Sequence, residues 1–157
     1  MRSALAVAVL ALGVAVFALL RTLDSEPDYT EAQRTDAVAA VCQAFEMVRT
    51  AVATNTNTEP PGGSTDVAGA LAAAANARVA LLDGGQYLLA RLEPATPADL
   101  ADEIRRFANQ LMDIGAAATA GVSNSDPVQA ARLADAEAAS ATLSARCASG
   151  DVGDEHP

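Results

Sequence analysis

The chain has 157 residues, 51% of them hydrophobic, and its 20 acidic residues against 10 arginines and no lysine give a formal net charge of −10. An acidic chain of this kind lacks the basic face that nucleic-acid binding requires, so we expect no nucleic-acid partner. Alanine supplies 39 residues, whereas tryptophan is absent. Because alanine is the strongest helix former and almost no stretch alternates with the period of a strand, the composition predicts an all-α protein.

The N-terminal segment is an unbroken apolar run from Ala4 to Leu20, bounded by Arg2 and Arg21. As a helix this run extends about 26 Å, at the lower limit for a hydrocarbon core of about 30 Å. The sequence therefore predicts a transmembrane anchor at residues 1–21 that enters the membrane with residues 4–20. A cleaved signal peptide is the alternative, but no A-x-A cleavage site follows the run, and this favours the retained anchor.

The flanking charges set the expected orientation. Arg2 and the amino terminus stand on one side of the run, and Arg21, followed closely by acidic residues, stands on the other. Acidic residues count little in the positive-inside rule. We expect a single-pass protein of the cytoplasmic membrane with its N-terminus inside and its C-terminal domain outside.

The chain has only two cysteines, Cys42 and Cys147, and their wide separation argues against a zinc ribbon or a thioredoxin-like pair. Outside the membrane two such thiols would oxidise together, so the predicted location favours a disulfide between them. The alternative is two separate cysteines buried in the core as small apolar side chains.

The first predicted helix follows a polar linker at residues 22–30. Asp28 is its expected cap, with Glu31 as the capping-box partner. Its apolar positions fall at helical spacing: Val38, Val41, Cys42, Phe45, Val48 and Val52. The prolines and glycines of residues 55–65 end it.

The second predicted helix is capped by Asp66 and continues to about residue 92. Its expected apolar face is built from Leu71, Ala75, Arg78, Leu82, Leu89 and Leu92. The helical phase survives Gly84 and Gly85, so we expect one long helix with a soft point there. Two helices divided at these glycines are the alternative.

Two further helices begin at cap-then-proline pairs, Thr96–Pro97 and Asp126–Pro127. The apolar face of the third is Leu100, Ile104, Phe107, Leu111, Ile114 and Ala118, and that of the fourth is Leu133, Ala136, Ser140, Leu143 and Cys147. The short connections predict an antiparallel, up-down-up-down helical bundle over residues 31–148. Its disulfide would close the membrane-proximal end, and residues 149–157 would form a disordered acidic tail.

Two strings of the predicted bundle, A-V-C-Q-A-F-E-M-V-R-T-A-V-A-T-N-T-N at residues 40–57 and N-A-R-V-A-L-L-D-G-G-Q-Y-L-L-A-R-L-E-P-A-T-P at residues 76–97, carry a family resemblance. With the closing cysteine, they resemble small alanine-rich membrane proteins of actinobacteria, above all of the mycobacterial type. The resemblance covers roughly residues 30–148. It implies one span, an extracytoplasmic helical domain with a cysteine at each end, and no assigned activity.

The polar residues indicate little chemistry. His156 is the only histidine and lies in the predicted tail, so neither a catalytic triad nor a histidine-based metal site can form around it. We therefore predict no catalytic residue, no metal, no cofactor and no enzymatic activity. Arg78 lies on or beside an apolar face, where it either extends its head to solvent or meets a buried carboxylate or an anionic ligand.

The acidic cluster of the third helix also has a structural explanation. Asp99, Asp102 and Glu103 lie near its start, where the helix dipole favours anions. Arg105 and Arg106 follow Asp102 at the spacing of helical salt bridges.

Two functions are consistent with this sequence. The first is a membrane-anchored module that acts by protein interaction, as an accessory subunit of an envelope or membrane complex. The second is a binding module for a small apolar or lipidic envelope molecule, held in an apolar cavity lined by Leu88, Leu89, Phe107 and Leu111.

Overall fold

The computed structural model describes residues 12–17, 28–60 and 62–150, in two compact units, Met1–Thr30 and Glu31–Pro157. In the first unit, residues 12–17 are helical, and Leu12 and Phe17 are among their exposed apolar side chains. The rest of the predicted anchor, most of the linker and the tail from residue 151, with His156, lie outside the described residues.

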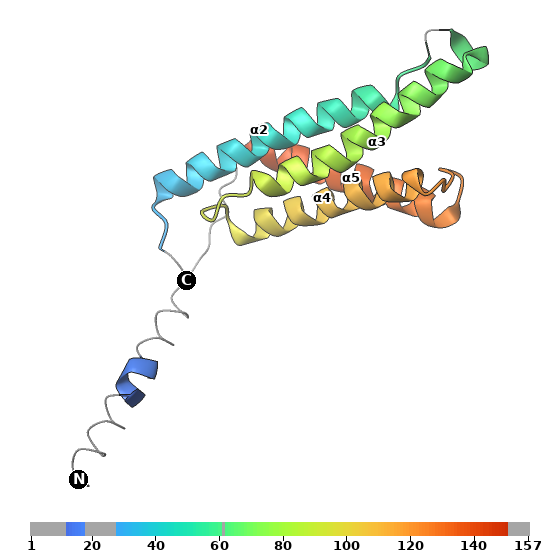
Figure 1. Cartoon of the computed structure of the whole chain (residues 1–157). Coiled ribbons are helices and arrows are strands. Elements are labelled where there is room, and N and C mark those ends of the chain that lie inside the picture. Colours follow the sequence, from blue (N-terminus) through green and yellow to red (C-terminus); the bar gives the residue numbers. More distant parts are fainter. Residues whose placement is uncertain (1–11, 18–27, 61, 151–157) are drawn as a thin grey trace. The chain divides into compact units, whose positions relative to one another are not determined.

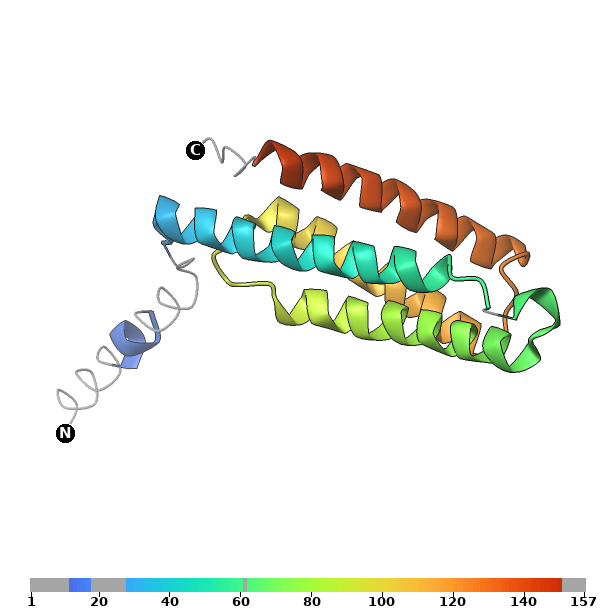
Figure 2. The same ribbon diagram turned by 90° about the horizontal axis from the view of Figure 1, so that it is seen from above.

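The second unit contains the long helices α2 (Glu31–Thr56), α3 (Val67–Ala90), α4 (Ala98–Thr119) and α5 (Pro127–Ser149), with a short 3-10 turn, η1 (Gly63–Thr65), before α3 (Figure 1). The described residues include no strand, and the predicted all-α class is confirmed. In Figure 2 the end of α5 lies at the same end of the bundle as the start of α2. The predicted disulfide joins them: Cys42 and Cys147 are bonded, with their Cα atoms 5.5 Å apart.

The core lies chiefly along α4. Its predicted apolar face is confirmed, because Leu100, Ile104, Phe107, Leu111 and Ile114 are all buried. The helix packs most extensively on α3, and α2 also packs on α3. The contacts of α5 with α4 are fewer, and those between α2 and α5 are the fewest of these pairs. The α2–α5 side is therefore the least closely packed side of the bundle.

The structure corrects the predicted face of α3. The helix is continuous through Gly84 and Gly85, so the alternative of two helices is wrong. Its buried residues are Leu81, Gly85 and Leu88, whereas Leu71 is 66% exposed. α3 carries apolar side chains on almost every side, so hydrophobic periodicity could not identify the side that faces the core.

Gly85 allows α3 and α4 to approach closely. A Cβ atom at Gly85 would lie 2.5 Å from the carbonyl oxygen of Ala108, whereas one at Gly84 would lie 2.9 Å from a methyl group of Val48. A backbone oxygen yields less easily than the end of a side chain.

We expect Gly85→Ala to lower the free energy of unfolding by about 1–3 kcal/mol. Gly84→Ala, the matched control, should be near neutral, because a helix-propensity gain of about 1 kcal/mol offsets its milder crowding. Equal urea midpoints for the two variants would contradict this packing.

The helix starts were predicted with mixed success. Asp66 accepts a hydrogen bond from the Gly69 N–H, and Asp126 accepts from the Val128 and Gln129 N–H groups, so both predicted caps are confirmed. The predicted Thr96 cap is wrong, because the extended ψ of 136° at Pro97 makes this proline the cap residue. Asp28 is also not a cap, since α2 begins only at Glu31.

Two helices of the described part, α2 and α3, are long and apolar enough to cross a membrane by length and composition alone. Part of the apolar surface of α2 enters the bundle core, whereas α3 buries little of its own. This is weak support for a membrane location, because core helices of soluble proteins have the same properties.

Candidate functional site

The bundle contains a half-open hollow of about 1060 Å³ to which all four long helices contribute. Its buried floor consists of Leu81, Phe107, Leu111, Ile114 and Ala136. On α2 the lining begins at Arg49 and on α5 it ends at Ser144, so the hollow lies beyond the disulfide, toward the α2–α3 connection. Ligand pockets typically measure about 300–1,000 Å³, and the volume of the hollow lies slightly above that range.

Small side chains explain why this space is not filled. α3 lines the hollow with Ala70, Ala73, Ala74 and Ala77, where a typical core would place Leu or Ile. α2 and α5 also make few contacts with each other, so these two helices do not close the space between them. The high alanine content thus leaves room inside the bundle.

Arg78 is the most unusual polar residue of the hollow. Its side chain is partly buried, and its Nε donates a hydrogen bond of 3.2 Å to the carbonyl oxygen of Ala118, near the end of α4. Among the described residues no carboxylate pairs with it. Arg78 is therefore a second donor to a helix-terminal carbonyl that also accepts from the Gly121 N–H. The terminal nitrogens of Arg78 are not among the buried polar atoms without a partner, which agrees with the first predicted role, extension of the head to solvent.

The other charged residues of the hollow lie at its edge. Arg49 is exposed and pairs with Glu46 at 2.7 Å, and Glu137 is an exposed residue of α5. The edge also carries neutral polar side chains, namely Thr56, Asn57, Asn124, Ser140 and Ser144. An apolar floor with a polar edge is the usual chemistry of a small-molecule site.

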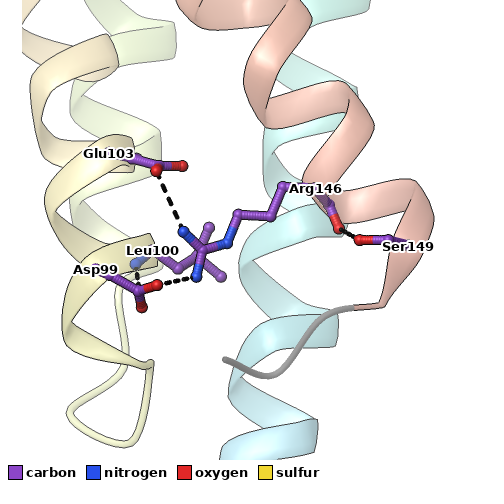
Figure 3. Close-up of polar contacts among 5 residues, drawn as sticks. All are labelled: Asp99, Leu100, Glu103, Arg146 and Ser149. Atoms are coloured by element: carbon purple, nitrogen blue, oxygen red, sulfur yellow. Dashed lines mark hydrogen bonds and ion pairs between the residues drawn. The ribbon is translucent and has the colours of Figure 1, made fainter. Parts of the chain in front are cut away.

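At the opposite end of the bundle a charged clamp joins α5 to α4 (Figure 3). Arg146, next to Cys147, pairs with Asp99 and, at 3.2 Å, with Glu103. Asp99 also accepts a hydrogen bond of 2.8 Å from the Leu100 N–H. The Arg146 side chain is only 16% exposed, so the clamp and the disulfide hold the same end of α5.

The clamp shifts the pKa values of its members. Burial raises the pKa of Asp99, but the hydrogen bonds from Arg146 and the Leu100 N–H, with the charge of Arg146, outweigh it and hold this pKa below the ordinary 3.8. Burial lowers the pKa of Arg146. The hydrogen bonds and negative charges of Asp99 and Glu103 outweigh this effect, so the pKa of Arg146 is raised above its ordinary value. The pair is therefore charged at neutral pH.

This shift predicts an acid-dependent contribution to stability. A carboxylate with a depressed folded-state pKa stabilises the fold above its unfolded pKa, and the contribution is lost as the pH falls through the folded pKa. We expect Asp99→Asn to lower the free energy of unfolding by about 1 kcal/mol or less at pH 7, because this carboxylate is 60% exposed. In urea titrations the difference from wild type should begin to shrink near the ordinary pKa of Asp99 and should disappear only below its depressed folded-state pKa. A difference that grows on acidification would contradict the clamp.

The structure distributes the four predicted cavity residues over two regions. Phe107 and Leu111 line the hollow, whereas Leu88 is fully buried in the core and Leu89 packs against that core. Sequence reasoning missed the contributions of α2 and α5, such as Val52 and Leu133. These residues stand on predicted apolar faces, but no local pattern indicated that a hollow lies between them.

The acidic residues of α4 combine predicted and unpredicted contacts. Asp102 pairs with Arg105 at 2.8 Å, as its spacing predicted. Asp99 and Glu103 instead bind Arg146, a residue of another helix that no local pattern indicated. The described residues contain no group of His, Cys, Asp and Glu side chains suited to a metal ion.

Comparison with protein-family models, curated proteins and solved structures finds no match to this chain. The resemblance to alanine-rich actinobacterial membrane proteins therefore stays a prediction.

Proposed function

We propose that this protein is a membrane-anchored extracytoplasmic module that binds a small apolar or lipidic molecule in the hollow of an up-down-up-down bundle. The observation that carries the proposal is the hollow itself, with its apolar floor and polar edge. Binding of this kind requires shape and apolar surface but no reactive side chain, so the proposed activity is non-enzymatic.

Residues 4–20 are the proposed single span, in preference to α2 or α3. α3 carries Arg78 and Asp83 well inside its length, and charged residues within a membrane span are costly. α2 contributes Phe45 and Val48 to the bundle core. The Cys42–Cys147 disulfide supports an outward-facing bundle, because disulfides persist in oxidising compartments.

Carbonate extraction of native membranes tests the anchor. The protein should stay in the pellet and retain the residues of the 4–20 segment, as determined by mass spectrometry. A soluble species that begins near Arg21 would overturn the anchor.

A pair of leucine substitutions tests the hollow. Ala77 lines the hollow, whereas Ala75 is exposed on α3 and does not line it. The full-length protein should be isolated from its native membrane with a lipid-solubilising polymer, and its bound organic compounds identified by mass spectrometry. An apolar compound should accompany wild type and Ala75→Leu but be depleted in Ala77→Leu. Equal recovery from both variants would overturn the proposed function.

A second function, binding of a partner protein, is favoured by the outer side of α3. Val67, Leu71 and Val79 are 70%, 66% and 55% exposed there, among exposed alanines. Such a face is suited to close packing against an apolar helix of a membrane-complex subunit. Leu71→Glu should then abolish co-purification of one stoichiometric subunit, and Met47→Glu, an exposed position on α2, should preserve it. If the subunit co-purifies with both variants, this face of α3 is not the interface.

A further inference from the structure

We propose that the hollow accepts a single-chain amphiphile with a carboxylate head, and that Arg78 binds this head while Phe107 and Leu111 contact the tail. The inference rests on the proposed function and narrows it, because an apolar ligand of any head chemistry would satisfy that function.

The argument begins with the charge of Arg78. It is the one cation of the hollow's described lining without a carboxylate partner, since Arg49 already pairs with Glu46. Arg78 lines the same hollow as the apolar floor, where its attraction for an anion is less screened than in open water. An anion from outside the chain would supply the charge partner that the described residues do not.

The geometry of Arg78 leaves donors available for such an anion. The contact between Nε and the Ala118 carbonyl oxygen fixes one edge of the guanidinium. No described residue accepts a hydrogen bond from its two terminal nitrogens. Arginine forms paired hydrogen bonds with the two oxygens of a carboxylate, so one arginine matches one monoanionic head. A dianionic head would meet greater repulsion from the acidic chain.

The apolar floor runs away from Arg78 in the direction that a tail requires. From Ala118, beside Arg78, the α4 lining continues through Ile114 and Leu111 to Phe107, about 16 Å along the helix axis. Leu81 of α3 and Ala136 of α5 line the same floor. A head at Arg78 would therefore place one extended acyl chain against the buried floor of the bundle.

Photolabelling of the full-length protein in phosphatidylcholine nanodiscs tests the assignment. The probes are palmitate with a diazirine near the end of its chain and the matched palmityl alcohol. In wild type, palmitate should label the Phe107–Leu111 segment at about ten-fold or more lower concentration than the alcohol. Arg78→Gln should abolish this preference and Arg78→Lys should keep part of it. The matched control is Arg106→Gln, which removes an exposed arginine outside the hollow and should leave the preference unchanged.

The outcomes separate the two proposals. Equal labelling by acid and alcohol in wild type, or a preference that survives in Arg78→Gln, overturns the carboxylate assignment. If Ala77→Leu still reduces labelling by both probes relative to Ala75→Leu, the apolar binding function stands. Absence of labelling in the hollow by either probe overturns the single-chain amphiphile assignment, and the compounds that co-purify with Ala77→Leu and Ala75→Leu then decide the proposed function. Circular dichroism of each variant ensures that only folded protein is compared.

Discussion

Replacing Cys42 and Cys147 together with alanine should lower the free energy of unfolding by about 4–5 kcal/mol. The disulfide connects residues 105 positions apart, and in the chain-entropy model closure of a loop of about 100 residues is worth about 4.7 kcal/mol. The typical stability of a domain is only about 5–15 kcal/mol. Because α2 and α5 share few other contacts, little remains to hold these two helices together.

Urea unfolding of the full-length protein, followed by the helical circular dichroism signal, measures this loss. Reduced wild type is the matched control and should unfold at the same urea concentration as the double variant. Hydrogen exchange should quicken first in α5, the helix that the disulfide and the Arg146 clamp hold at one end. A double variant within about 1 kcal/mol of the oxidised protein would show that helix packing alone supports the bundle.

The sequence predicted best where one helix has one apolar side. α4 alternates charged residues with a single apolar seam, so its buried residues Leu100, Ile104 and Phe107 followed directly from the period. The Asp126 cap was equally local, because a side chain and the N–H groups two and three residues later determine it.

The sequence predicted worst where the rotation of a helix decides the contact. α3 is apolar on nearly every side, so its period was compatible with several orientations, and close approach at Gly85 selected one. The contact between Arg78 and Ala118 depends on that rotation, whereas the contact between Arg146 and Glu103 depends on the pairing of α5 with α4. For the same reason, Phe107 could be assigned to the interior, but the hollow beside it could not be located.

Phe107→Ala should lower the free energy of unfolding by about 3–5 kcal/mol, the usual cost of truncating a buried phenylalanine. The Phe107 side chain is 3% exposed, and its ring packs edge-on against Phe45, with centroids 5.5 Å apart. Because Phe107 also lines the hollow, its removal enlarges a space that no neighbouring side chain fills. The thermal midpoint should fall by about 10 °C or more.

A double-mutant cycle with Phe45→Ala distinguishes ring packing from simple loss of volume. The coupling between the two rings should be about 0.5–1.5 kcal/mol, the value of an edge-on aromatic pair beyond its buried area. Leu71→Ala is the exposed control and should change the stability by less than about 0.5 kcal/mol. Phe107 supports α4 at the point where the hollow meets the closed core, so a loss as small as that of Leu71→Ala would place its ring outside the core. The Phe107 ring would then not form part of the buried lining of the hollow, and the proposed contact between this ring and the acyl chain would be wrong.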